Sequence, residues 1–221
     1  MFERDYILRM FSMLGRALAR IVFFKETKSY DAALLEVDNT GLSLLGLNTE
    51  TLERLPASNL KDVLGSDPAL LQSRLYTAGV LLKEKAEILD EMGKEGETAA
   101  MYMKSLRLMT EYINGIEELD GRKGIATVDA VVGKLRDYEL PADLKRRLVE
   151  YFEYSGRYDK SEDLIFEMVE DDPSFVPEGI TFYERLLTKS DAELENGRLP
   201  RSEVEDALNE LQKKQRSAKE V

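Results

Sequence analysis

Helical spacing of apolar residues constrains this chain more than any other feature. At 100° per residue, residues 2–25 place one broad apolar face on a helix, formed by Ile7, Met10, Phe11, Leu14, Ala17, Leu18, Ile21 and Val22. Later segments repeat this spacing, and none shows sustained alternation with β-branched enrichment. With 14 glycines and 6 prolines in 221 residues, chain breakers are too scarce for a many-turned β fold. We therefore expect an all-α fold without a β-sheet.

Turn and capping signals divide the rest of the chain into further helices. We expect them at about 30–45, 68–92, 97–113, 125–137, 142–155, 158–171, 177–188 and 201–215. Residues 48–68 form an irregular connection with two short capped segments, residues 114–124 a glycine-rich loop, and residues 213–221 a frayed tail. Ser202 and Glu205 resemble a capping box for the last helix. Because most turns are short, we expect antiparallel helical hairpins in a single domain over residues 1–221.

Composition excludes several kinds of chemistry. The chain has no cysteine and no histidine, which rules out disulfides, thiolate nucleophiles, imidazole catalysis and Cys or His metal ligands. Acidic runs at 117–120 and 170–172 lack the ligand spacing of a calcium loop. We therefore expect no metal and no cofactor.

Charge and hydropathy narrow the partners and the location. A net charge of −12, without any block of five basic residues, disfavours nucleic acid. Arginines interrupt the apolar N-terminus, and no stretch approaches the ~20 apolar residues that span a bilayer. We expect a cytoplasmic protein with no nucleic-acid partner and no integral membrane segment.

Residues 142–173 resemble one tetratricopeptide repeat (TPR), a helix-turn-helix unit of about 34 residues. The matching positions are Leu148, Phe152, Gly156, Tyr158, Ser161, Ile165, Met168 and Pro173. In this match Gly156 takes the positive φ that ends the first helix, Ser161 allows close helix crossing, and Tyr158 packs over the turn.

Two weaker echoes of this unit occur, at residues 28–40 and 93–106. They place Tyr30, Ala33, Val37 and Thr40, and Gly93, Ala99, Met103 and Leu106, at comparable spacing. The resemblance thus covers about half of the chain, which looks like the small, uncharacterised bacterial TPR-like families. It implies a TPR-like array of helical hairpins.

The TPR resemblance also implies a binding surface, because the first helix of each unit lines a peptide groove. The matching groove positions are Asp143, Arg146, Glu150 and Glu153. Arg146 suits the TPR type that grips a C-terminal carboxylate, but Arg147 and Glu150 replace its asparagines. The alternative is an exposed helix with an Arg146–Glu150 pair at i, i+4.

The N-terminal helix carries two further candidate surfaces. Arg9, Arg16 and Arg20 form a narrow stripe opposite the apolar face, which is either an anion or lipid-headgroup site or a solvated polar face. Met13 and Phe23 lie off the apolar face. They are available to a second subunit or to another helix of the same chain.

Three function classes remain. The leading hypothesis is a non-catalytic, TPR-like scaffold that binds a protein or peptide. The alternative is a structural homo-oligomer, in its simplest form a homodimer, that assembles through the N-terminal helix. The third hypothesis is a carboxylate-based enzyme of the kind that helical di-metal bundles form. It is remote, because those enzymes use Glu-x-x-His pairs and this chain has no histidine.

Overall fold

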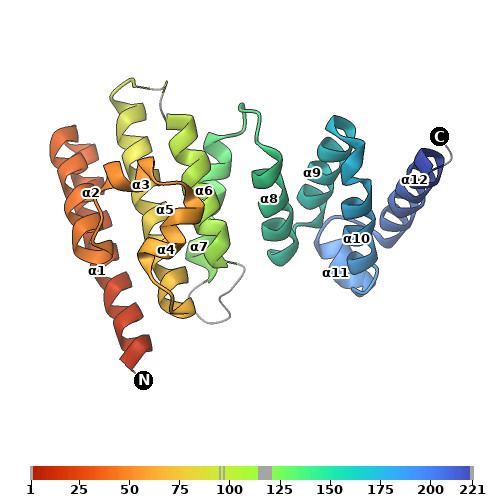
Figure 1. Ribbon diagram of the computed structural model, residues 1–221, viewed down its shortest axis with the longest axis horizontal. Helices are drawn as coiled ribbons and strands as arrows, with labels where there is room; N and C mark the ends of the chain where they lie inside the picture. Colours follow the sequence, from red (N-terminus) through yellow and green to blue (C-terminus); the bar gives the residue numbers. More distant parts are fainter. Residues whose placement is uncertain (1, 95, 97, 114–120, 220–221) are drawn as a thin grey trace. The chain divides into compact units, whose positions relative to one another are not determined.

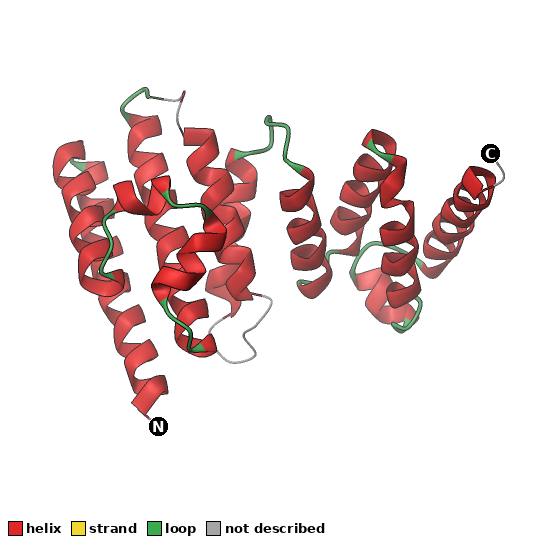
Figure 2. Ribbon diagram, in the orientation of Figure 1, coloured by secondary structure: helices red, strands yellow, loops and turns green. Residues whose placement is uncertain are grey.

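The computed structural model describes residues 2–94, 96, 98–113 and 121–219. These residues form helices joined by loops and contain no strand, so the expected all-α class is confirmed (Figures 1 and 2). The chain divides into two compact units, residues 1–140 and residues 141–221, and each is described by itself. The expectation of a single domain over residues 1–221 stays a prediction.

Unit 1 is built around its longest internal helix, α5. Its described helices are α1 (Phe2–Glu26), α2 (Tyr30–Leu45), α3 (Thr49–Arg54), α4 (Ala57–Leu64), α5 (Pro68–Glu91), α6 (Thr98–Ile113) and α7 (Gly121–Lys134). Helix α5 packs against α1, α2, α3, α4 and α6, and α7 packs against α6 (Figure 1). A helix with neighbours on several sides needs apolar residues on several sides. Helix α5 has them, since Val80, Leu81 and Leu82 are successive and all buried.

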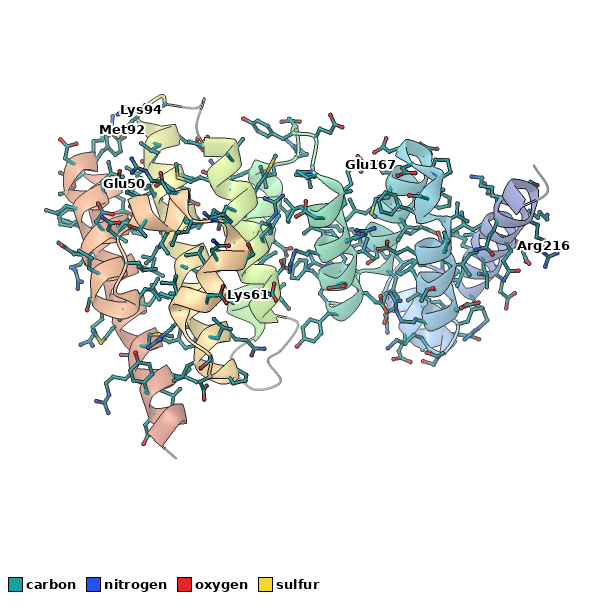
Figure 3. The ribbon with its side chains drawn as sticks, viewed as in Figure 1. Glu50, Lys61, Met92, Lys94, Glu167 and Arg216 are labelled. Atoms are coloured by element: carbon teal, nitrogen blue, oxygen red, sulfur yellow. The ribbon has the colours of Figure 1, made fainter. Side chains whose placement is uncertain are left out.

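The short helices α3 and α4 occupy the connection expected at 48–68. Asn48 caps α3, because its side chain accepts a hydrogen bond from the Thr51 N–H. Lys61 of α4, labelled in Figure 3, forms an ion pair with Glu111 of α6. The irregular connection is therefore a covering layer of unit 1 with its own caps and contacts.

Unit 2 contains α8 (Ala142–Tyr154), α9 (Tyr158–Asp171), the 3-10 helix η2 (Pro173–Phe175), α10 (Val176–Leu186), α11 (Asp191–Asn196) and α12 (Arg201–Lys219). Helix α8 packs on α9, α10 packs on α9 and α12, and α11 packs on α12. The core comprises Val149, Tyr158, Ile165, Val169, Val176, Ile180, Phe182, Tyr183, Leu186, Leu194, Leu199, Val204, Ala207 and Leu211. Ser161 is buried and donates to the Val149 carbonyl at 2.9 Å, as suits a close α8–α9 crossing.

The turn between α8 and α9 confirms the predicted role of Gly156. Its φ is +70°, and the Arg157 N–H donates to the Phe152 carbonyl at 2.8 Å. The Gly156 N–H donates to the Glu153 carbonyl at 3.1 Å, which completes a Schellman motif. The ring of Tyr158 packs somewhere unexpected. It covers Gly197 at the end of α11, where an added Cβ would lie 2.2 Å from the ring.

The same left-handed turn occurs at both weaker echoes of the repeat. Gly93 after α5 has φ +76°, and Lys28 after α1 has φ +55°. Gly46 after α2 and Arg198 after α11 adopt the same conformation, with φ +73° and +60°. The two charged residues occupy a conformation that ordinarily favours glycine.

Several predicted boundaries were wrong. Helix α7 begins at Gly121 and ends at Lys134, so it starts inside the expected loop and stops before 137; residues 114–120 of that loop lie outside the described range. Helix α12 continues through Lys219, so the tail expected to fray from 213 is helical there. Lysine, glutamine, arginine and alanine favour helix, which explains the extension.

The predicted capping box was also misplaced. Helix α12 begins at Arg201, which puts Ser202 inside its first turn. The capping box opens α11 instead: the Ser190 N–H donates to Glu193 Oε2 at 2.9 Å, and the Glu193 N–H donates to Ser190 Oγ at 3.3 Å. Helix α11 itself was not predicted.

Candidate functional site

Arg146, the central residue of the expected groove, joins α8 to α10. Its Nε donates to Glu178 Oε2 at 2.9 Å. Its guanidinium carbon lies 4.7 Å from the centroid of the Phe175 ring, within cation–π range. Arg146 is therefore held toward α10 while half of its side chain, 49%, stays exposed.

Glu153 makes the second link between the same two helices. Arg185 Nε donates to Glu153 Oε1 at 3.1 Å, and Arg185 Nη2 donates to Oε2 at 2.7 Å, so the pair is bidentate. The hydrogen bond with Glu153 raises the pKa of the Arg185 guanidinium. Arg185 keeps 48% of its side chain exposed.

These two pairs form a ladder of alternating charge along α8 and α10, which we call the α8–α10 ladder. On α8 the order is Arg146 then Glu153, and on α10 it is Glu178 then Arg185. Each step spans seven residues, or about 10 Å. The structure thus brings together two of the four predicted groove residues. Asp143 and Glu150 lie exposed on the same helix.

The predicted arginine stripe on α1 does not act as one unit. Arg20 pairs with Glu36 of α2 and so fastens α1 to its neighbour. Arg9 and Arg16 are exposed and form no ion pair with another described residue. An anion site that uses all three arginines stays a prediction.

Met13 and Phe23, the expected self-interface, are both on the surface. Met13 is 37% exposed and Phe23 is 58% exposed. Met13 also lines a cavity of about 250 Å³ between α1 and α2, together with Arg20, Glu36 and Asn39. Self-association through these residues stays a prediction.

The chain matches the sequence model of one known protein family. Residues 1–216 match the model of a family described as "Family of unknown function (DUF6483)". This chain belongs to the DUF6483 family. No curated protein and no solved structure matches it. The matching family model is not a TPR model, so the TPR resemblance of this DUF6483 chain stays a prediction.

A buried ion network between α1 and α5 was missed at the sequence level. Lys25 of α1 lies 2.7 Å from Glu87 and 3.6 Å from Glu84. Lys83 lies 2.7 Å from Glu84 and 2.9 Å from Glu87. Lys25 also lies 3.8 Å from the more exposed Glu91, so two cations face three carboxylates. The i, i+4 spacing of Lys83 and Glu87 inside an apolar helix was the available signal.

The network shifts the pKa values of Lys25, Lys83 and Glu87 in the direction that favours their charged forms. Burial lowers the pKa of Lys83, but Glu84 and Glu87 outweigh this, so the net pKa is raised. Burial raises the pKa of Glu87, but the hydrogen bond from Lys25 and the charge of Lys83 bring it below its ordinary value. The contacts of Lys25 with Glu84 and Glu87 tie α1 to α5 and are suited to holding the two helices together.

A small polar cavity of about 230 Å³ lies between the ends of α5, α6 and α7. It is lined by Asp90, Thr98, Tyr102, Lys134 and Tyr138. The Tyr102 hydroxyl donates to Asp90 at 2.7 Å, and burial followed by this carboxylate raises the pKa of Tyr102. Tyr102 is therefore a hydrogen-bond donor here, and its raised pKa makes it a poor general base.

The described residues contain neither a metal-binding cluster nor a helix that could span a membrane. No group of three or more carboxylates there is arranged to hold a metal ion. The acidic run at 117–120 lies outside the described residues. No described helix is both long enough and apolar enough to cross a bilayer.

Proposed function

We propose that this DUF6483 chain is a non-catalytic helical scaffold that binds a protein or peptide along the α8–α10 ladder. The supporting observation is that the ion pairs Arg146–Glu178 and Glu153–Arg185 join α8 to α10 while both arginines stay about half exposed. Exposed ion pairs contribute only about 0–1 kcal/mol each. An incoming chain can therefore exchange its own charges for them at small cost.

The ladder suits an extended or helical segment of mixed charge. Helices α8 and α10 are separated in sequence by α9 and packed on it, as the first helices of successive TPR-like units would be. A segment laid along them meets opposite charges at steps of about 10 Å. Alternation of sign would then set the register of the bound segment.

The test is affinity capture of partners with the full chain and two matched variants. Arg146→Glu breaks the pair with Glu178, whereas Arg146→Glu with Glu178→Arg keeps an ion pair and reverses its direction. Recognition by the ladder predicts that both variants lose the same partner. Arg216→Glu, on the exposed side of α12, is the control and should retain it.

Two results would count against the proposal. Capture by all three variants would show that charge at 146 is irrelevant to recognition. Recovery of the partner by the double variant would show that the ion pair matters for local structure rather than for contact.

A further inference from the structure

The outer side of α1 is a surface that a globular chain rarely leaves uncovered. Helix α1 packs against α2 and α5 through Met10, Leu14, Ala17 and Ile21. At 100° per residue, Leu8, Gly15, Ala19 and Val22 share an arc of about 60° on the other side. Leu8 is 48% exposed and Val22 is 45% exposed. We call these four residues with Arg9, Arg16 and Phe23 the α1 outer face.

The charges on this face determine which kind of partner it can bind. The chain has 43 acidic residues, yet none lies between Tyr6 and Lys25. Arg9 and Arg16 lie beside the apolar stripe, and neither is paired with a described residue. A partner that covers this face therefore has to present carboxylates beside its own apolar surface.

The shape of the face suits a helix. Gly15 lies midway between Leu8 and Val22, and an added Cβ there would meet nothing within 4 Å. The missing side chain leaves a notch, and helix axes that pack closely lie about 8–10 Å apart. A second helix can seat one of its side chains in this notch while Leu8 and Val22 flank it.

We propose that the α1 outer face docks an acidic amphipathic helix of a partner protein. The apolar stripe of that helix covers Leu8, Gly15 and Val22, and its carboxylates meet Arg9 and Arg16. This is helix-in-groove recognition with electrostatic selection. It concerns a different surface from the α8–α10 ladder and does not depend on it.

Two other occupants fit the charges less well. A two-fold antiparallel contact between two copies of α1 brings the arginines of both copies to the same side, with no acid between them. A bilayer laid against α1 also approaches α2, where the exposed Asp31 repels anionic headgroups.

The probe is a fluorescein-labelled synthetic amphipathic helix of about 20 residues, with a leucine–alanine stripe and glutamates on both flanks. A matched peptide replaces every glutamate by lysine. Fluorescence anisotropy is measured against the full chain at low salt, where charge pairs are least screened. We expect saturable binding of the glutamate peptide and none of the lysine peptide.

Two variants separate docking from folding. Arg9→Glu with Arg16→Glu should weaken the glutamate peptide by about tenfold or more, because two attractions become repulsions. Gly15→Leu should abolish binding by filling the notch, yet leave the melting temperature unchanged or raised, because leucine favours helix more than glycine does. Lys213→Glu and Asn209→Leu, on the exposed side of α12, should bind as the unmodified chain does.

Three outcomes would overturn the proposal. The first is no binding of the glutamate peptide, or equal binding by the Gly15→Leu variant. The second is binding of phosphatidylserine-containing vesicles without binding of the peptide, which assigns the face to lipid. The third is a dimer mass by light scattering that Gly15→Leu reduces to a monomer mass, which assigns the face to a second copy.

Discussion

The first and last helices, α1 and α12, are both long and both packed on one side, but their outer sides differ. Every exposed residue of 201–217 is polar: Ser202, Glu203, Glu205, Asp206, Asn209, Glu210, Lys213, Lys214, Arg216 and Ser217. Arg216, labelled in Figure 3, lies on the outer side of α12. Helix α1 instead exposes Leu8, Val22 and Phe23 beside two arginines.

End helices of helical arrays normally carry polar outer faces, because no further repeat covers them. The exposed side of α12 has this polar character, and the exposed side of α1 does not. The difference indicates that α12 faces solvent, whereas the α1 outer face is suited to a partner.

The inner sides should be equally important, and their loss gives the largest effect. Leu211 of α12 is 1% exposed and Ile21 of α1 is 0% exposed. Truncation of either to alanine leaves a cavity and should cost about 2–5 kcal/mol of unfolding free energy. Urea denaturation followed by circular dichroism measures this. A cost below about 1 kcal/mol at one site only would show that the two helices are anchored unequally.

Lys25 should give the next largest effect, because α12 has no counterpart to its buried network. Lys25→Met leaves Glu84 and Glu87 with Lys83 as their remaining close cation. We expect a loss of about 2 kcal/mol, since removing one member of a buried ion network leaves charge poorly compensated. Unfolding free energies at neutral pH check this value, with the exposed Lys213→Met on α12 as the control.

The ion network should also make the stability of the chain depend on pH. The pKa of Glu87 in the folded chain lies below its ordinary value, which is about 4.3 in an unfolded chain. Its stabilising contribution is therefore complete above that unfolded value and is lost as pH falls through the lower folded value. Between pH 6 and pH 3 the unmodified chain should lose more stability than Lys25→Met. Equal losses would show that Glu87 does not contribute to the pH dependence of stability in this range.

Gly15 separates stability from function on the outer side. Gly15→Ala should raise the unfolding free energy by about 0.5–1 kcal/mol, because glycine is a poor residue inside an exposed helix. Thermal melts measure the gain. A loss of stability would mean that something already occupies the notch, contrary to its open surroundings.

The smallest effects concern the turns beside the two helices. Lys28 after α1 and Arg198 before α12 adopt φ +55° and +60°, where glycine is free of steric cost. Lys28→Gly should gain about 0.5 kcal/mol once the larger unfolded-state entropy of glycine is subtracted. Arg198→Gly should gain less, since Arg198 also lies 3.7 Å from Asp159. Thermal melts of both variants and of the unmodified chain measure these gains. Destabilisation of both variants would contradict the prediction.

Local sequence signals predicted the parts of the fold that local physics determines. Long periodic helices such as α1 and α5 and the glycine turn at Gly156 follow from spacing and backbone preference. Helix α11 was not predicted, because its six residues are too few to show a clear apolar periodicity. Its capping box at Ser190 was the signal that could have identified it. The start of α7 escaped because two glycines lie within its first turn.

The candidate site depended on contacts that no local pattern contains. Arg146 and Glu178 are 32 residues apart, as are Glu153 and Arg185, so their pairing requires the packing of α9 and α10. The ion pair of Arg20 with Glu36 was missed for the same reason, since Glu36 lies on another helix, α2. The exposed side of α1 was predictable in composition, but its open notch required the structure.

The most direct test of the difference between α1 and α12 is NMR chemical-shift mapping of the full chain with the glutamate peptide. The account predicts amide shift changes that cluster within residues 8–23 of α1, with residues 201–219 of α12 unchanged. Changes that cluster on α12, or that are absent from α1 at saturating peptide, would contradict it.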